Sequence, residues 1–154
     1  MKTTSLLLLI AYIKNKYNLR DIIFDASLNC AGDYNNKSRI IRLNPLYENK
    51  DITLLHELGH MLLLNHPQIS KFNKYGIGSN GCYTTEYLCE WFAWYIHFEI
   101  KHERARNMAL SYVNSLEREN KVVRKTYMKS WLKSITNHLK NESIQIKKAY
   151  REYQ

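Results

Sequence analysis

The sequence predicts a small α+β domain in which helices outnumber strands. The chain has 154 residues, of which 45% are hydrophobic, and it holds only two prolines and five glycines. A chain of this length can bury a sizeable core, and so few helix-breaking residues favour a helix-rich fold. Strand-like segments are confined to residues 20–44, and helical patterns precede and follow them. We therefore expect one domain with a short antiparallel or mixed sheet of about three strands and several helices.

The first expected element is a helix that begins near Thr4 and ends near Tyr17. Its apolar stretch from Leu6 to Ile13 follows a single lysine, a pattern that also occurs in signal peptides. The stretch is too short to span a bilayer, and the flanking KNKYNLR contains no small-residue cleavage site. We interpret it as a helix that packs on the core, and we expect the protein in the cytoplasm.

Two strand-like segments follow the first helix. RDIIFDASL, residues 20–28, carries an apolar run, and SRIIRLN, residues 38–44, has two arginines around an apolar pair, as on an edge strand. Turn residues at Gly32–Asp33 and Asn35–Asn36 separate the two segments. The second segment therefore belongs to a predicted hairpin that ends at Pro45.

Two apolar helices are expected next, one on each side of a glycine-containing loop. Asp51 or Thr53 is the expected N-cap of the first, which runs to Leu64. The loop covers residues 68–82 and holds three of the five glycines. The second helix begins near Thr84 with the sequence TTEYLCEWFAWYIHFEI, in which apolar residues dominate.

The basic character of the chain belongs to its last third. Residues 1–100 contain 10 Lys and Arg against 9 Asp and Glu, a balance of +1, whereas residues 101–154 contain 13 against 5, a balance of +8. This extension is helical in pattern, and we expect it to pack on the same domain as residues 1–100. The apolar residues that recur in it about every four positions are Tyr127, Trp131, Ile135 and Leu139.

The basic face of this extension has three interpretations. It binds nucleic acid, docks on an acidic partner protein, or is solvated while the other face packs on the core. We favour the solvated face, because Glu117, Glu119 and Glu142 are interspersed among the basic residues.

The three cysteines, Cys30, Cys82 and Cys89, are odd in number and lack paired spacing. Such a set is typical of reduced thiols rather than of a disulfide framework. Cysteine usage therefore also favours a cytoplasmic protein.

The stretch DITLLHELGHMLLLNH, residues 51–66, places two histidines and a glutamate inside an apolar helix. His56 and His60 are one helical turn apart and project from the same face, where both can bind one metal ion. Glu57 would lie beside that ion, in a position to take a proton from a bound water. Two imidazoles, a carboxylate and an open position suit Zn²⁺, so we expect one zinc ion. The alternative is a pair of core histidines satisfied by hydrogen bonds.

A third protein ligand is needed, and two residues compete for the place. His66 lies ten residues after His56, as in H-E-x-x-H-x-x-G-x-x-H, but Leu63 replaces the glycine that lets the chain turn back. Glu86 and Glu90 lie one turn apart on the next apolar helix, where carboxylates need partners. We favour Glu86 as the ligand and Glu90 as the acceptor that orients a ligating imidazole. The alternative for both carboxylates is exposure to solvent or pairing with surface lysines.

The two helices together resemble the ImmA/IrrE family of zinc metallopeptidases. The match consists of LLHELGHMLLLNH and EYLCEWFAWYI, with SRIIRLNP ahead of them, and it covers about half of the chain. The family has E-x-x-A-[N/D]-x-F-A on the second helix, where the first glutamate is the third zinc ligand. Glu86, Phe92 and Ala93 match this pattern, whereas Cys89 replaces the usual alanine and Glu90 the usual Asn or Asp.

The resemblance implies a zincin-like, gluzincin-type core in residues 1–100 and a cytoplasmic endopeptidase that cuts a specific protein. The substrate in that family is often a transcriptional repressor, and the genes are commonly carried by phages or mobile elements. Zinc would polarise the scissile carbonyl while Glu57 activates the water. An edge strand such as residues 38–44 could bind the substrate backbone by strand addition.

Four residues are candidates for the donor that stabilises the oxyanion, namely Tyr34, Tyr75, Tyr83 and His97. A different function is also compatible with the sequence. In that alternative the protein is a non-hydrolytic, zinc-containing regulator that binds a partner or DNA through its basic C-terminal helices.

Overall fold

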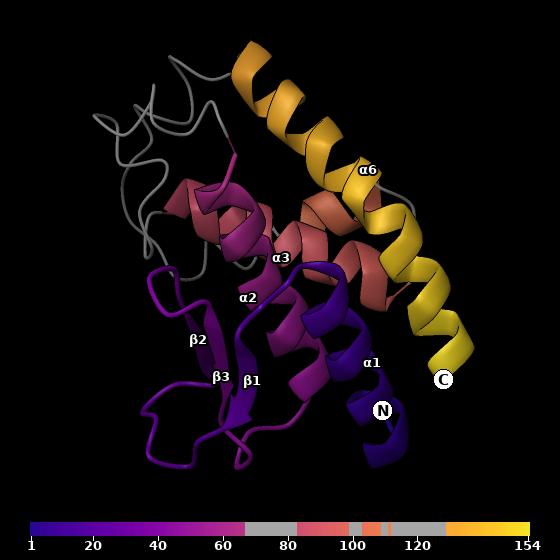
Figure 1. The fold of residues 1–154 in the computed structure, drawn as a ribbon. Helices are drawn as coiled ribbons and strands as arrows, with labels where there is room; N and C mark the ends of the chain where they lie inside the picture. Colours follow the sequence, from indigo (N-terminus) through magenta and orange to yellow (C-terminus); the bar gives the residue numbers. More distant parts are fainter. Residues whose placement is uncertain (67–82, 99–102, 109–110, 112–128) are drawn as a thin grey trace.

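The computed structural model describes residues 1–66, 83–98, 103–108, 111 and 129–154, without the side chains of residues 83–84 and 129–134. The predicted α+β class and the small mixed sheet of three strands are confirmed (Figure 1). Residues 103–108 are also helical. The elements are, in chain order, α1 (Thr3–Lys16), β1 (Asp21–Phe24), β2 (Gly32–Asn35), β3 (Ile40–Leu43), α2 (Lys50–Leu64), α3 (Tyr83–His97) and α6 (Lys129–Tyr153).

The sheet has the order β1-β3-β2, with β3 parallel to β1 and antiparallel to β2. The prediction that residues 38–44 form an edge strand is therefore wrong, because β3 is hydrogen-bonded on both sides. The prediction of a turn at Gly32–Asp33 is also wrong, since these two residues begin β2. The two edges of the sheet are β1 and β2, and the hairpin connects β2 to β3.

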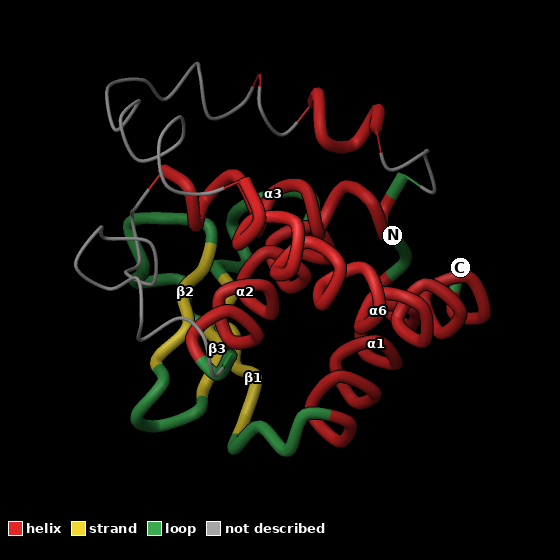
Figure 2. The backbone as a smooth tube through the Cα atoms, turned by 90° about the horizontal axis from the view of Figure 1, so that it is seen from above, coloured by secondary structure: helices red, strands yellow, loops and turns green. Residues whose placement is uncertain are grey.

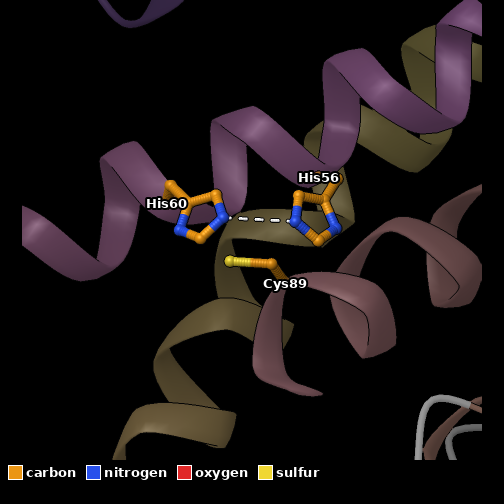
Figure 3. Close-up of side chains that lie close together, drawn as sticks. All are labelled: His56, His60 and Cys89. Carbon is orange, nitrogen blue, oxygen red and sulfur yellow. Dashed lines mark hydrogen bonds between the residues drawn. The ribbon is translucent and has the colours of Figure 1, made fainter. Parts of the chain in front are cut away.

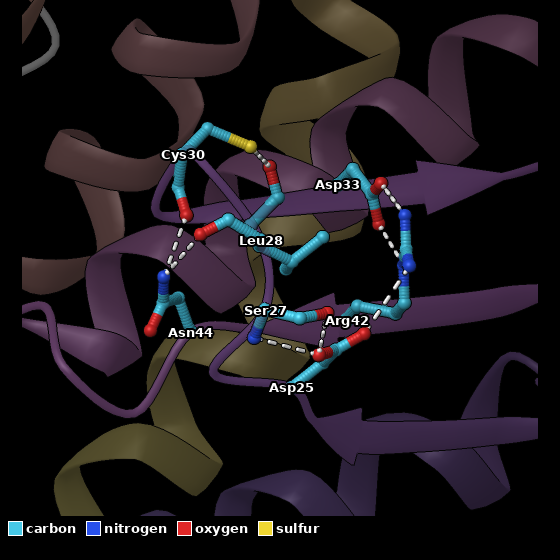
Figure 4. Close-up of polar contacts among 8 residues, drawn as sticks. Asp25, Ser27, Leu28, Cys30, Asp33, Arg42 and Asn44 are labelled. Atoms are coloured by element: carbon cyan, nitrogen blue, oxygen red, sulfur yellow. Dashed lines mark hydrogen bonds and ion pairs between the residues drawn. The ribbon is translucent and has the colours of Figure 1, made fainter.

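Two ion pairs explain how an arginine is tolerated in the central strand. Arg42 forms ion pairs with Asp33 of β2 and with Asp25, which follows β1 (Figure 4). Each carboxylate lies next to β3, so the guanidinium bridges the two outer strands across the central one. The positive charge of Arg42 is thus neutralised within the sheet. An arginine beside an apolar pair is therefore compatible with a central strand as well as with an edge strand.

Helix α1 matches the predicted first helix and packs its apolar face inward. Leu6, Leu9 and Ile13 are buried, and the helix contacts β1, α2 and α6. Among the described residues, no helix is long and apolar enough to cross a lipid bilayer.

Helix α2 is the most deeply buried helix of the described structure. It packs on β2 and β3 with one side and along α3 with another, and its residues from Leu54 to Leu63 are all buried (Figure 2). Its end at Leu64 agrees with the prediction. The prediction of an N-cap at Asp51 or Thr53 is wrong, because Asn49 precedes the helix in a left-handed conformation and makes no side-chain cap.

Helix α6 lies on the far side of the helices from the sheet, against α1 and α3 (Figure 1). Its buried side chains include Ile135, Leu139, Ile146 and Tyr150. The Tyr17 hydroxyl at the end of α1 donates a hydrogen bond of 2.9 Å to Glu142 Oε2. Among the residues expected to form its apolar face, Ile135 and Leu139 are buried, whereas Tyr127 and the Trp131 side chain lie outside the described residues. The division of the chain at residue 100 stays a prediction.

A buried polar network joins the ends of three helices. Asp51 in the first turn of α2 accepts hydrogen bonds from His97 Nδ1 at 2.8 Å and from the Tyr150 hydroxyl at 2.7 Å. Burial would raise the pKa of the Asp51 carboxyl, but the hydrogen bonds from His97 and Tyr150 outweigh it and hold the pKa at about 2. Asp51 is therefore an anchor for α3 and α6 rather than a cap of α2.

This network predicts a measurable effect of removing one hydroxyl. We expect Tyr150→Phe to lower the free energy of unfolding at pH 7 by about 1.5–3 kcal/mol, because a buried carboxylate loses a donor. Urea denaturation measures the change. Tyr153→Phe is the matched control, since the Tyr153 ring packs edge-on against Tyr12 and is not part of the network at Asp51.

The contribution of Asp51 to the free energy of unfolding depends on pH with a definite sign. The pKa of Asp51 in the folded state, about 2, lies below its ordinary value of 3.8, so the ionised carboxylate stabilises the fold above about pH 4. This contribution is lost as the pH falls toward 2. The difference between wild type and Tyr150→Phe should therefore shrink on acidification, and a difference independent of pH would contradict the assignment.

Candidate metal centre

The side chains of the candidate site come from two helices that pack unusually close together. A Cβ atom added at Gly59 of α2 would lie only 3.2 Å from Cα and Sγ of Cys89 in α3. A larger residue than glycine would therefore push the helices apart. His56 and His60 are four residues apart on α2, close to Gly59, and Glu86 is three residues before Cys89 on α3. All three side chains therefore lie near this contact.

Three polar side chains converge on one point. Nε2 of His56 lies 3.0 Å from Glu86 Oε2, and Nε2 of His60 lies 3.0 Å from Glu86 Oε1. The two Nε2 atoms are 3.2 Å apart, and a dashed line joins the two rings in Figure 3. The structure thus brings His56, His60 and Glu86 together, and it does so in a largely buried place, since only 5% of the His60 side chain and 20% of the Glu86 side chain are exposed.

Glu90 contacts the other nitrogen of the first histidine. His56 Nδ1 forms a buried hydrogen bond with Glu90 Oε1. A carboxylate only accepts hydrogen bonds, so His56 carries a proton on Nδ1 and can present the lone pair of Nε2 to an ion. Glu90 therefore occupies the position expected of a residue that orients a ligating imidazole.

The electrostatics of the group favour a positive charge at its centre. Burial would lower the pKa of His56, but hydrogen bonds with Glu86 and Glu90 outweigh it and raise the pKa to about 10. Burial would likewise raise the pKa of Glu86, yet the hydrogen bonds from His56 and His60 hold it well below its usual value. Two carboxylates around two imidazoles thus hold a proton where a metal cation could replace it.

Hydrogen bonding alone leaves the histidine pair incompletely satisfied. Nδ1 of His60 is buried and, within the described part of the chain, has no hydrogen-bond partner. The alternative of two core histidines satisfied by hydrogen bonds requires partners for both rings. Within the described residues, an ion at Nε2 would leave this Nδ1 unpartnered as well, so it is the donor set of two Nε2 atoms and a carboxylate that favours a metal ion.

A sulfur atom also belongs to this group. Donor atoms of His56, His60 and Cys89 all lie within 4.8 Å of one another, and all three residues are buried (Figure 3). This buried group could hold a metal ion. The sequence analysis treated Cys89 as a departure from a family pattern and did not consider it as a possible metal ligand. The signal was its position three residues after Glu86, which places both side chains on the same side of α3.

Glu57 lies at a cavity of about 340 Å³ that opens beside the group. Burial raises the pKa of the Glu57 carboxyl, and the imidazoles of His56 and His60 oppose the increase. No side chain of the described residues hydrogen-bonds to this carboxylate. A carboxylate that faces a cavity without a protein partner is able to bind a water molecule there.

Residues 30–34, which include the first three residues of β2, also line the cavity. Two hydrogen bonds from Asn44 Nδ2, 2.8 Å to the Leu28 carbonyl and 3.2 Å to the Cys30 carbonyl, hold the segment that leads into this strand (Figure 4). Asp33 lines the cavity but is paired with Arg42, so it adds little free negative charge.

His66, the rival third ligand, lies at a different place. Its ring packs edge-on against His138 of α6, with 4.8 Å between the ring centroids. Burial and the neighbouring imidazole lower the pKa of His66. His66 does not line the cavity, so the structure does not bring it to His56 and His60.

The four candidates for an oxyanion donor are also separated. Tyr34 lines the cavity, and its hydroxyl donates a hydrogen bond of 2.9 Å to Asn36 Oδ1. His97 instead binds Asp51 in the network that joins the helix ends. Tyr75 and the Tyr83 side chain lie outside the described residues.

Comparison of the chain with models of protein families, with curated proteins and with solved structures finds no significant match. The chemistry of this chain therefore has to be inferred from the arrangement of its own side chains. Within the described residues, that arrangement is a buried group that could hold a metal ion, with two carboxylates against its imidazoles and a cavity beside it.

Proposed function

We propose that this protein is a zinc-dependent endopeptidase that cleaves a specific intracellular protein. The observation that carries the proposal is the spacing of three donor groups. Nε2 of His56 lies 3.0 Å from Glu86 Oε2, Nε2 of His60 lies 3.0 Å from Glu86 Oε1, and the two Nε2 atoms are 3.2 Å apart. A tetrahedral zinc ion with bonds of about 2.0–2.1 Å places its donor atoms about 3.3–3.4 Å apart, so an ion would fit after a very small expansion.

The resemblance of α2 and α3 to the ImmA/IrrE family supports the same proposal. Its two motifs fall on the helices that carry these donors, and its third-ligand position is Glu86. A zincin-like fold and a gluzincin-type ligand set are therefore part of what we propose. A transcriptional repressor as the substrate is the suggestion of this resemblance alone.

Bound zinc would polarise the scissile carbonyl and lower the pKa of a bound water. Glu57 of the chain itself supplies the base. Its carboxylate accepts a proton from the attacking water and then donates it to the leaving amine. Burial, which raises the Glu57 pKa, helps the residue to hold that proton between the two steps. Tyr34 lines the same cavity and is the described candidate that could reach the oxyanion after releasing Asn36.

The edge of β2 is a suitable place for the substrate backbone to dock. Among the described residues, β2 is paired with β3 on one side only, and it lines the cavity that holds Glu57. An extended peptide could add to the free edge of β2 and so carry a peptide bond past the metal centre. This corrects the expectation of docking on residues 38–44, since β3 has no free edge.

A second candidate function is a non-hydrolytic, metal-containing regulator. The observation that favours it is Cys89, because a fourth protein donor would leave no open position on a tetrahedral ion. In that case the ion stabilises the contact between α2 and α3, and the protein acts by binding a partner or DNA.

The ligand set can be tested by metal analysis. We expect Glu86→Ala and His60→Ala to lower zinc affinity by more than about 100-fold, because each loses a direct donor. His66→Ala is the matched control and should keep one zinc ion per chain after dialysis. If Glu86→Ala keeps one zinc ion per chain while His66→Ala loses its zinc, then His66 and not Glu86 is the third ligand.

Glu57→Gln tests the catalytic proposal. The variant should keep its zinc, because Glu57 is not a donor, and lose peptidase activity by about 10²–10⁴-fold, since the amide cannot act as a base. Mass spectrometry of a proteome-derived peptide library incubated with zinc-loaded protein detects the cleavage products. Equal product formation by the variant would rule out this mechanism, and metal-loaded wild type without any products would favour the regulator.

Glu90→Gln tests the orientation of His56. The amide oxygen can still accept a hydrogen bond from Nδ1 but carries no charge. The imidazole is then less basic and binds the metal ion more weakly through Nε2. We expect zinc affinity to fall by about 10–100-fold with little change in secondary structure. Competition with a chelating dye measures the affinity, and circular dichroism provides the folding control. An unchanged affinity would mean that Glu90 only fills space.

A further inference from the structure

We infer that Cys89 is a fourth protein donor of the metal centre, so that the resting site has two imidazoles, one carboxylate and one thiolate. The inference rests on the proposed metal site, and it adds a ligand that closes the open position. In the proposed peptidase, the sulfur leaves the ion when the substrate carbonyl or the water enters.

The first argument is distance. The donor atoms of Cys89, His56 and His60 lie within 4.8 Å of one another. A tetrahedral ion with zinc–nitrogen bonds of about 2.0–2.1 Å and a zinc–sulfur bond of about 2.3 Å needs about 3.5–3.6 Å between nitrogen and sulfur. The sulfur is therefore at most about 1.3 Å too far away, which is less than one side-chain rotation moves it.

The second argument is the position of the sulfur relative to the other donors. Figure 3 shows Cys89 reaching from α3 toward the two imidazoles of α2. Glu86 lies one turn earlier on the same helix, so α3 would supply two donors and α2 the other two. Four donors from two packed helices form a closed set of the kind found in structural metal sites.

The third argument is chemical. Cys89 is fully buried, so solvent cannot stabilise the negative charge of its thiolate, and a bound cation would have to do so. The group beside it contains two imidazoles and two carboxylates. When an ion enters, a metal–sulfur bond forms, the S–H bond breaks, and the proton leaves to solvent. A soft sulfur donor also favours Zn²⁺, Co²⁺ and Cd²⁺ over Mg²⁺ and Mn²⁺.

The competing explanation gives Cys89 a packing role only. Its side chain fills the narrow contact opposite Gly59, where a cysteine can act as a small apolar residue. Both explanations predict burial, so burial does not distinguish them. A spectroscopic measurement does, because only a bound thiolate transfers charge to the metal.

The experiment uses the full chain with Cys30→Ala and Cys82→Ala, which leaves Cys89 as the one thiol, and compares it with the same protein carrying Cys89→Ala as well. Each metal-free protein is titrated with Co²⁺, and the absorption spectrum is recorded. We expect a near-ultraviolet thiolate-to-cobalt band at one Co²⁺ per chain in the first protein and its loss in the second. We also expect Co²⁺ affinity to fall at least about tenfold without the thiol, as for loss of a coordinating partner.

The outcomes separate the two levels of the proposal. The protein that keeps Cys89 could show the visible bands of bound cobalt without the charge-transfer band. That result would overturn the role of Cys89 and leave His56, His60 and Glu86 as the site. No cobalt bands in either protein would overturn the metal centre itself. Thermal unfolding of both metal-free proteins shows that each is folded, and His60→Ala in the single-thiol protein should abolish the band although its thiol is intact.

Discussion

The close approach of α2 and α3 is the constraint on which the rest of the structure depends. It requires a residue without a side chain at Gly59, because a Cβ atom added there would lie only 3.2 Å from Cα and Sγ of Cys89. Only at this separation can His56 and His60 of one helix meet Glu86 of the other at 3.0 Å. The packing of two apolar helices and the chemistry of the site are therefore consequences of the same contact.

Burial gives this contact its electrostatic character. His56, Glu57, His60 and Glu90 are buried among leucines and aromatic residues, where a charge is stable only beside an opposite charge. The carboxylates of Glu86 and Glu90 raise the pKa of His56 against the effect of burial, and the same negative charges favour a metal cation in place of that proton. The cavity beside the group, bounded by β2, is the route by which solvent and a peptide could reach Glu57.

The C-terminal helix contributes by holding the ends of both site helices. Tyr150 and His97 meet at Asp51, which joins the first turn of α2 to the last turn of α3. This anchoring accounts for the buried face of α6. Basic residues such as Lys140 and Lys148 are exposed, and the interpretation of their face as solvated stays a prediction.

Local pattern by itself determined the α+β class, the extents of α1 and α2, and the pairing of two histidines on one helical face, since helical periodicity acts over a few residues. It also identified Glu86 and Glu90, because carboxylates in an apolar helix need partners. Only the tertiary structure decided that β3 is central, since the parallel partner β1 lies about twenty residues earlier in the chain and no short-range signal marks this pairing. The same holds for Asp51, whose partners are 46 and 99 residues away, and for the sulfur of Cys89, which reaches the histidines only because two helices touch at Gly59.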